Sequence, residues 1–319
     1  MKPLGFHAAL CQITGDWKAY KEQFRLPQHN ENSGCCWSCA VTPAGIRDAS
    51  SSAPWRTQRL NHWDVINRML AEGLTLSTLF NVPCFDTKLF RYDWLHVGDQ
   101  GVAADWLGQM FFFMLPKFPG STDAIRCNAL WREVQAYYQE TGCESRLDAL
   151  VPSMLSPSAT APKLKAKAAE VRALVPCAAR LACQHLDSAD PLEDAVKACT
   201  LHLAECYKCL SHKETFSADL LAQASRRFCL LYVEIERLTE QRPFRIKPKM
   251  HLWQEMCEMH IGTRPSLYWT YRDEDFGGTL ARMARRRGGR STARSTGESV
   301  LSRFAGKADV PDVAVSEDT

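Results

Sequence analysis

Residues 196–210, VKACTLHLAECYKCL, carry the pattern that decides the fold of the middle of this chain. Apolar side chains stand at positions 196, 199, 203, 206 and 210, in steps of three and four residues. Such steps place all of them on one face of an α-helix. Ala, Leu, Lys and Glu dominate the surrounding stretch as well. We therefore expect residues 161–241 to form an all-α module.

The sequence on either side predicts some β-structure. Residues 8–16 are expected to form a short strand that stops at Gly15 and Asp16, followed by a helix over 17–24. We expect further helices over 58–72, 100–115, 131–140, 250–259 and 275–287. The expected segments are a core strand and helix at 1–26, a Cys-containing loop at 27–57, a mixed helical region at 58–150, the helical insertion at 161–241, a C-terminal part of the core at 245–290 and a disordered tail at 291–319.

The composition excludes several classes of protein. With 45% apolar and 24% charged residues among 319, the chain is neither wholly disordered nor fibrous. The longest apolar run, Met110–Leu115, is far shorter than the roughly 18 to 20 residues of a membrane helix, so no membrane partner is expected. The N-terminus has no apolar signal core, which predicts a nuclear or cytoplasmic protein that is not secreted.

The loop at 27–57 contains the best local metal signal, Cys36-x-x-Cys39. A two-residue spacer lets both thiolates reach one tetrahedral Zn²⁺. One pair is half a site, and His29 is our first candidate for a further ligand. Other residues that could complete the site across space are Cys35, His62 and Cys84. The alternative interpretation is a redox-inert surface cluster without metal.

A second set of potential ligands lies on the helix predicted over 196–210. It consists of Cys199, His202, Cys206, Cys209 and His212, which we call the Cys/His stripe. All five would lie along one side of a single helix, where one ion could reach only two or three of them. Buried thiols commonly serve as small apolar side chains. We therefore favour core packing over metal binding for this stripe.

Two acids stand at the ends of apolar segments. Asp16 follows the predicted strand, and Glu274 follows the aromatic run Leu267–Tyr271. Converging carboxylates can hold a pair of Mg²⁺ ions that cleave phosphodiesters. The structural alternative is that Asp16 caps the helix from Trp17 and that Glu274 lies in the first turn of the next helix.

Several short motifs stand at intervals along the chain: Thr14–Ala19 with the downstream Cys36–Cys39, Asp93–His96, Lys247–Leu252 and Leu267–Leu280. Together these segments resemble motifs of CACTA/Plavaka-like DDE transposases. The resemblance implies a ribonuclease-H-like α/β core interrupted by the long helical insertion, with Asp16 as the second catalytic acid and Glu274 as the third. It also implies that residues 8–14 and 267–271 are neighbouring strands, or at least packed together, because only that places Asp16 beside Glu274. The family's first aspartate lies on a strand upstream of the second, and only fifteen residues precede Asp16 here. We therefore expect a transposon-derived remnant, or a truncated gene product, that lacks nuclease activity, with Mg²⁺ as cofactor if it were active.

A basic segment supports a nucleic-acid partner. Residues 279–294 hold six arginines and no acid: Arg282, Arg285, Arg286, Arg287, Arg290 and Arg294. Such a segment is expected to bind the phosphate backbone of DNA without sequence preference. A solvated helix face or a nuclear-import signal would explain the same charges. The alternative function is a non-enzymatic helical interaction protein with a structural zinc clip.

Overall fold

The computed structural model describes residues 10, 12–27, 36–155, 161–211, 216–240, 242–259, 264–271 and 302. The chain divides into a unit from Met1 to Trp269 and a second unit from Thr270 to Thr319. The account below concerns the described residues of the first unit.

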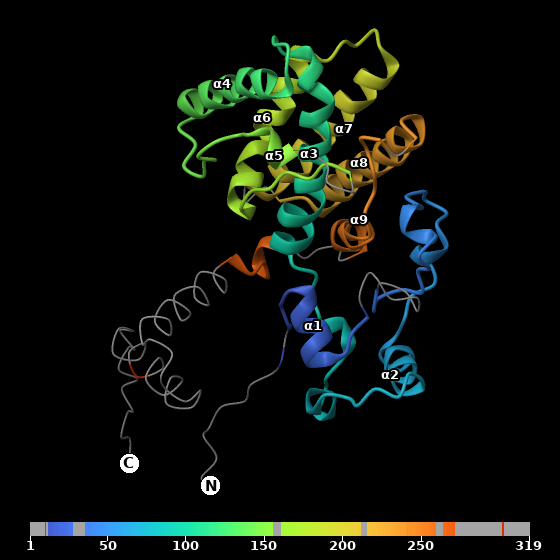
Figure 1. Cartoon of the computed structure of the whole chain (residues 1–319). Coiled ribbons are helices and arrows are strands. Elements are labelled where there is room, and N and C mark those ends of the chain that lie inside the picture. The colour runs from blue at the N-terminus through green and yellow to red at the C-terminus, as the bar shows by residue number, and fades with distance from the viewer. Residues whose placement is uncertain are drawn as a thin grey trace. The chain divides into compact units, whose positions relative to one another are not determined.

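Helices make up most of the regular structure in these residues (Figure 1). The longer α-helices are α1 (Trp17–Phe24), α2 (His62–Ala71), α3 (Ala104–Met114), α4 (Asp123–Thr141), α6 (Ala168–His185), α7 (Pro191–Ser211) and α8 (Ala218–Leu238). The short ones are α5 (Pro152–Leu155) and α9 (Lys249–Gln254). Two π-helical segments continue them, Leu95–Ala103 into α3 and Glu255–Met259 from α9. Single 3₁₀ turns span Gly45–Arg47, Pro54–Arg56, Thr78–Asn81, Thr87–Leu89, Leu115–Lys117 and Pro265–Leu267.

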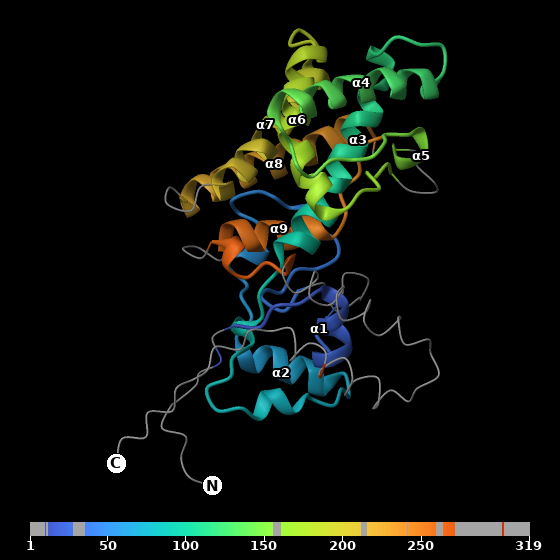
Figure 2. The same cartoon turned by 90° about the vertical axis from the view of Figure 1, so that its left-hand side faces the viewer.

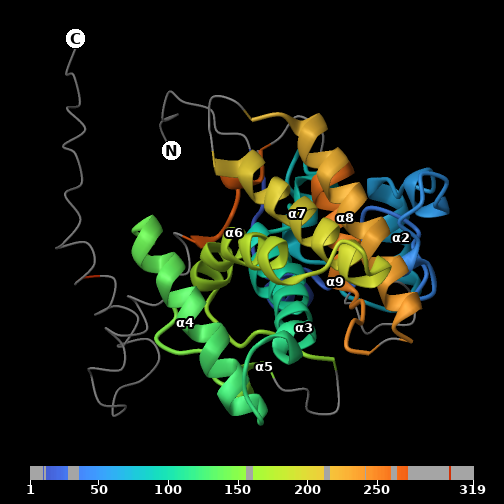
Figure 3. The same cartoon turned by 90° about the horizontal axis from the view of Figure 1, so that it is seen from above.

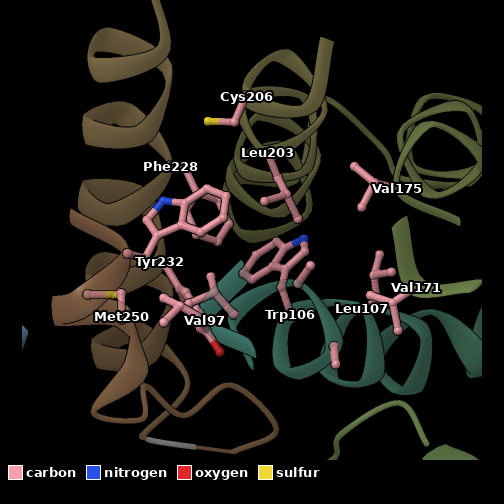
Figure 4. Close-up of a cluster of buried hydrophobic side chains, with 14 of the residues drawn as sticks. Val97, Trp106, Leu107, Val171, Val175, Leu203, Cys206, Phe228, Tyr232 and Met250 are labelled. Carbon is pink, nitrogen blue, oxygen red and sulfur yellow. The ribbon is translucent and has the colours of Figure 1, made fainter. Parts of the chain in front are cut away.

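The helical block expected over 161–241 is present as α6, α7 and α8. Helices α7 and α8 pack along each other, and α6 lies against α7 (Figure 3). Helix α3 contacts α6 and contributes Trp106, which lies amid buried side chains from α6, α7 and α8 (Figure 4). The Trp106 ring meets the rings of Tyr232 and Phe228 edge-on, at centroid distances of 4.8 and 5.7 Å. Its indole nitrogen donates to the Thr200 hydroxyl at 3.1 Å, so the buried polar atom is satisfied.

Helix α9 with its π-helical continuation connects this helical group to the N-terminal part of the unit (Figure 2). It contacts α8, the π-helical segment at 95–103 and the turn at 45–47. All residues from Met250 to Glu258 are buried. One short helix therefore lies at the meeting point of segments that are far apart in the sequence.

The expectation of a ribonuclease-H-like core is not supported. The described residues contain no sheet, only two isolated bridges, Ile13 with Phe90 and Cys39 with Arg59. The bridge at Ile13 cannot extend, because α1 begins four residues later and residues 87–89 form a 3₁₀ turn on the other side. The predicted strand at 267–271 is wrong as well, since the chain makes a 3₁₀ turn at Pro265–Leu267 and Ile13 pairs with Phe90 instead.

Candidate metal centre

Cys36 and Cys39 are held in a tight loop against the segment that precedes α2. Ala40 donates its amide to Gln58 O at 2.9 Å, and Leu60 donates to Ser38 O at 3.1 Å. Within the loop, the Ser38 amide donates to Cys36 Sγ at 3.3 Å. The two sulfur atoms lie 3.6 Å apart. The two-residue spacer therefore places both sulfurs on the same side of the loop, as the sequence predicts.

The other half of the centre comes from α9 and its continuation. His251 and Glu255 are four residues apart, so they share one face of this helix. His251 Nε2 lies 3.3 Å from Cys39 Sγ and 3.7 Å from a Glu255 carboxylate oxygen. One donor atom from each of Cys36, Cys39, His251 and Glu255 lies within 4.8 Å of the other three. We call these four residues the metal cluster.

These distances fit a tetrahedral metal ion. In a tetrahedral site, Zn–S bonds of about 2.3 Å place two sulfurs about 3.8 Å apart. A Zn–N bond of about 2.0 Å places a sulfur and a nitrogen about 3.5 Å apart. The cluster shows 3.6 Å and 3.3 Å for these pairs. None of the four residues is more than 1% exposed. Two thiols, an imidazole and a carboxylate gathered in a dry interior form a donor set suited to a metal ion.

Arg59 balances the charge of the cluster. Its guanidinium forms a two-pronged ion pair with the Glu255 carboxylate, at 2.6 and 2.8 Å. Two thiolates, one carboxylate and a divalent cation sum to one negative charge, which Arg59 neutralises. A buried site whose charges cancel avoids most of the cost of burying unpaired charge. Hydrogen bonds to ligating carboxylates also fix their orientation.

The protonation of the two thiols is unequal. Burial alone would raise the pKa of Cys36, but the hydrogen bond from Cys39 and the hydrogen bond and charge of His251 outweigh it and hold this pKa well below its ordinary value. The hydrogen bond with Cys36, followed by burial, raises the pKa of Cys39. The Tyr92 hydroxyl lies 3.0 Å from Cys36 Sγ, and burial raises the pKa of Tyr92 well above its usual range. Tyr92 is therefore protonated and can donate to the sulfur.

A second buried carboxylate lies on the same helix, one turn beyond the cluster. Glu258 accepts hydrogen bonds from Arg56 at 2.7 Å and from Arg226 of α8 at 3.0 Å. Glu258 thus ties the helix to the loop before α2 and to α8 through ion pairs. It lies outside the metal cluster.

The structure brings together two of the predicted metal ligands and adds two that sequence reasoning missed. Cys36 and Cys39 converge as expected, whereas His29 and Cys35 lie outside the described residues. His62 accepts a bond from the Thr87 amide at 3.3 Å, and Cys84 is exposed, so neither belongs to the cluster. The missed ligands had a usable signal, because His251 and Glu255 stand four apart in a segment predicted to be helical.

The Cys/His stripe follows the core-packing interpretation. Cys199 and Cys206 of α7 are completely buried, and burial raises the pKa of each well above its usual range. They pack with the apolar interior, Cys206 near Leu203 and Phe228 (Figure 4). His202 and Cys209 are half-buried on the same helix, and His212 lies outside the described residues.

Asp16 serves as a helix cap, the structural alternative to a catalytic role. Its carboxylate accepts the Ala19 amide at 2.5 Å at the start of α1. It does not belong to a cluster of three or more potential metal ligands in the described part of the chain. Glu274 and the six arginines from Arg282 to Arg294 lie outside the described residues.

Two further acids lie in or just after the Asp93–His96 motif. Asp93 accepts hydrogen bonds from the amide and from Nδ1 of His96, at 3.0 and 2.6 Å. Asp99 accepts the Tyr207 hydroxyl at 2.6 Å and is fully buried. Both acids therefore have structural hydrogen-bond partners.

No helix in the described residues combines the length and apolar character needed to cross a bilayer. Comparisons with known proteins leave the family open. No protein family model, no curated protein and no solved structure matches this chain.

Proposed function

We propose that this chain is a helical binding protein stabilised by a structural Zn²⁺ held by Cys36, Cys39, His251 and Glu255. The observation that carries the proposal is the convergence of four donor atoms within 4.8 Å from two segments more than 200 residues apart. Two sulfur donors and a nitrogen donor beside one carboxylate favour Zn²⁺ over Mg²⁺ or Ca²⁺, which prefer oxygen ligands.

A structural role is better supported than a catalytic one. Catalytic zinc sites keep one position open for water or substrate, whereas this cluster supplies four protein donors. All four residues are also buried, so a substrate would have no direct approach to the ion. The ion would close a very long loop between Cys39 and His251, which strongly restricts the unfolded chain.

Metal analysis of the purified chain tests this proposal. We expect about one zinc per chain, and we expect Co²⁺ substituted for Zn²⁺ to show the intense thiolate-to-cobalt absorption of a tetrahedral site. The variant Cys39→Ser should lose the ion. A matched control, Cys206→Ser, removes an equally buried thiol from α7 and should retain it. Zinc retained in Cys39→Ser and lost in Cys206→Ser would overturn the assignment.

DNA binding and an origin from a DDE transposase remain predictions that rest on sequence motifs and charge. Six arginines contacting about six phosphates would give a slope of about −5 in log affinity against log salt. Replacing Arg285, Arg286 and Arg287 with Ala should flatten the slope by about three. An unchanged slope would remove this segment from any DNA interface. Mn²⁺-dependent nicking abolished by Glu274→Gln would instead show that nuclease activity survives.

A further inference from the structure

A cavity of about 260 Å³ lies at the start of α1, beside but separate from the metal cluster. Four segments line it: the start of α1 with Asp16 and Trp17, the Cys36–Cys39 loop with Trp37, the segment from Tyr92 to Val97, and α9 with Lys249 and Leu252. Its volume falls just below the usual 300–1,000 Å³ of sites for drug-sized ligands. A ligand in it would be a small molecule of about the size of an amino acid.

Two side chains of opposite charge line this cavity without an ion-pair partner in the described residues. Asp16 accepts the Ala19 amide as a helix cap, and no basic side chain in the described part of the chain lies within 4.0 Å of its carboxylate. Lys249 donates one hydrogen bond, to His96 O at 2.8 Å, which leaves further N–H donors on its ammonium. No acid in the described residues lies within 4.0 Å of that ammonium.

The position of Lys249 is fixed by close packing. Its stem crosses Gly101, where a Cβ would lie 2.8 Å from Lys249 Cδ and 3.0 Å from His96 O. Only a residue without a side chain lets the lysine lie this close to the π-helical segment. The ammonium is therefore held at the cavity wall by packing as well as by its hydrogen bond.

The rest of the wall is largely aromatic. Trp17, Tyr20, Trp37 and Tyr92 contribute to it. The Trp17 indole nitrogen donates to Pro27 O at 3.0 Å, and the Tyr20 hydroxyl donates to backbone oxygens of Ile13 and Arg91. These polar atoms are engaged by the backbone, so the rings offer mainly apolar surface to a ligand.

We propose that this cavity binds a free α-amino acid with an aromatic or apolar side chain. The α-carboxylate would pair with Lys249, the α-ammonium with Asp16, and the side chain would lie against the aromatic wall. A zwitterion matches a cavity that presents one unpaired charge of each sign, whereas an anion or a cation alone leaves one charge unmatched. The other acid in the wall, Asp93, is already hydrogen-bonded by His96.

Calorimetric titration of the full zinc-loaded chain with L-phenylalanine tests this proposal. Two further ligands each lack one charge: 3-phenylpropionate has no ammonium and 2-phenylethylamine has no carboxylate. We expect L-phenylalanine to bind at least about tenfold more tightly than either, because each charge-assisted hydrogen bond contributes that much or more. Equal binding of 3-phenylpropionate would overturn the zwitterion assignment, as would no binding of L-phenylalanine.

Substitutions test which residue binds each charged group of the ligand. Asp16→Asn keeps a good helix cap but removes the negative charge, so it should weaken L-phenylalanine about tenfold and leave 3-phenylpropionate unchanged. Lys249→Met should weaken both of these ligands. Lys18→Gln is the matched control, since Lys18 lines the same cavity but is 76% exposed and pairs with Glu22. Unchanged affinity in both Asp16→Asn and Lys249→Met would place binding elsewhere.

Discussion

Cys36 and Cys39 of the metal cluster are as deeply buried as Cys199 and Cys206 of the Cys/His stripe, yet the surroundings of the two pairs differ. Cys36 and Cys39 face an imidazole, a carboxylate and a tyrosine hydroxyl that come from other segments. Cys199 and Cys206 face the apolar interior between α7 and α8. The pKa of Cys36 is lowered by its polar neighbours, whereas burial raises the pKa of Cys206.

The difference teaches that spacing along one segment is a weak guide to metal binding. The stripe offers more potential ligands than the Cys36–Cys39 pair, but its members within the described residues all project from α7. The metal cluster has two short spacings, Cys-x-x-Cys in a loop and His-x-x-x-Glu on a helix, that meet across the fold. Convergence of donors from separate elements is what surrounds an ion on all sides.

The largest expected effect is loss of the metal cluster. Cys39→Ser should release the zinc and lower the free energy of unfolding by several kcal/mol, because binding of a structural ion is part of the folding free energy. Urea denaturation with and without a chelator measures it: the chelator should destabilise the original chain and leave Cys39→Ser unaffected. A chelator effect that persists in this variant would break the comparison.

Substitution of two glutamates on one helix distinguishes a metal ligand from an ion-pair partner. Glu258→Gln leaves Arg56 and Arg226 without their buried partner and should cost about 3 kcal/mol of stability, with zinc retained. Glu255→Gln removes a ligand and should weaken zinc binding by about tenfold or more. Zinc titrations of both variants measure this. Equal zinc affinity in the two would show that Glu255 is only an ion-pair partner of Arg59.

Much of the helical fold could be predicted from the sequence. Residues 161–241 form helices because their apolar positions recur in steps of three and four, and α1 begins at Trp17 as expected. Whether the expected strands form could not be predicted from the local sequence alone. The run at 8–16 is apolar enough for a strand, but a strand also needs a partner of similar length, and Phe90 offers only a single bridge.

Two of the four residues of the metal cluster could be predicted from the sequence. Cys-x-x-Cys has a spacing that indicates metal binding by itself, whereas His251 and Glu255 acquire a role only where α9 meets the loop more than 200 residues away. That meeting depends on the packing of α9 against α8 and the turn at 45–47, which no local pattern encodes. The cap at Asp16 was one of two interpretations, and the hydrogen bond that the Ala19 amide donates to its carboxylate shows this cap, while the catalytic role stays a prediction.

A conservative exchange in the Cys/His stripe should have a small effect. Cys206→Val keeps a side chain of similar size in an apolar setting, so stability should change by less than about 1.5 kcal/mol and zinc content should be unchanged. Thermal unfolding and metal analysis of the same sample measure both quantities. If Cys206→Val lost zinc, the stripe would hold the ion and the contrast between the two regions would fail.

The smallest expected effect concerns Asp16, which the sequence analysis singled out because it follows a predicted strand. Asp16→Ala removes the acceptor for the Ala19 amide and should cost about 1 kcal/mol, the usual loss for a helix cap. Asp16→Asn can accept the same hydrogen bond and should stay within a few tenths of a kcal/mol of the original chain. Urea denaturation of the two variants compares their free energies of unfolding, and zinc content should be the same in both.

A helix cap depends on the shape and the hydrogen-bond acceptor of the side chain, whereas a catalytic acid depends on its charge. If Asp16→Asn abolished a Mn²⁺-dependent cleavage of DNA while leaving stability unchanged, the charge would be what matters, and Asp16 would have the catalytic role that the motif resemblance implies.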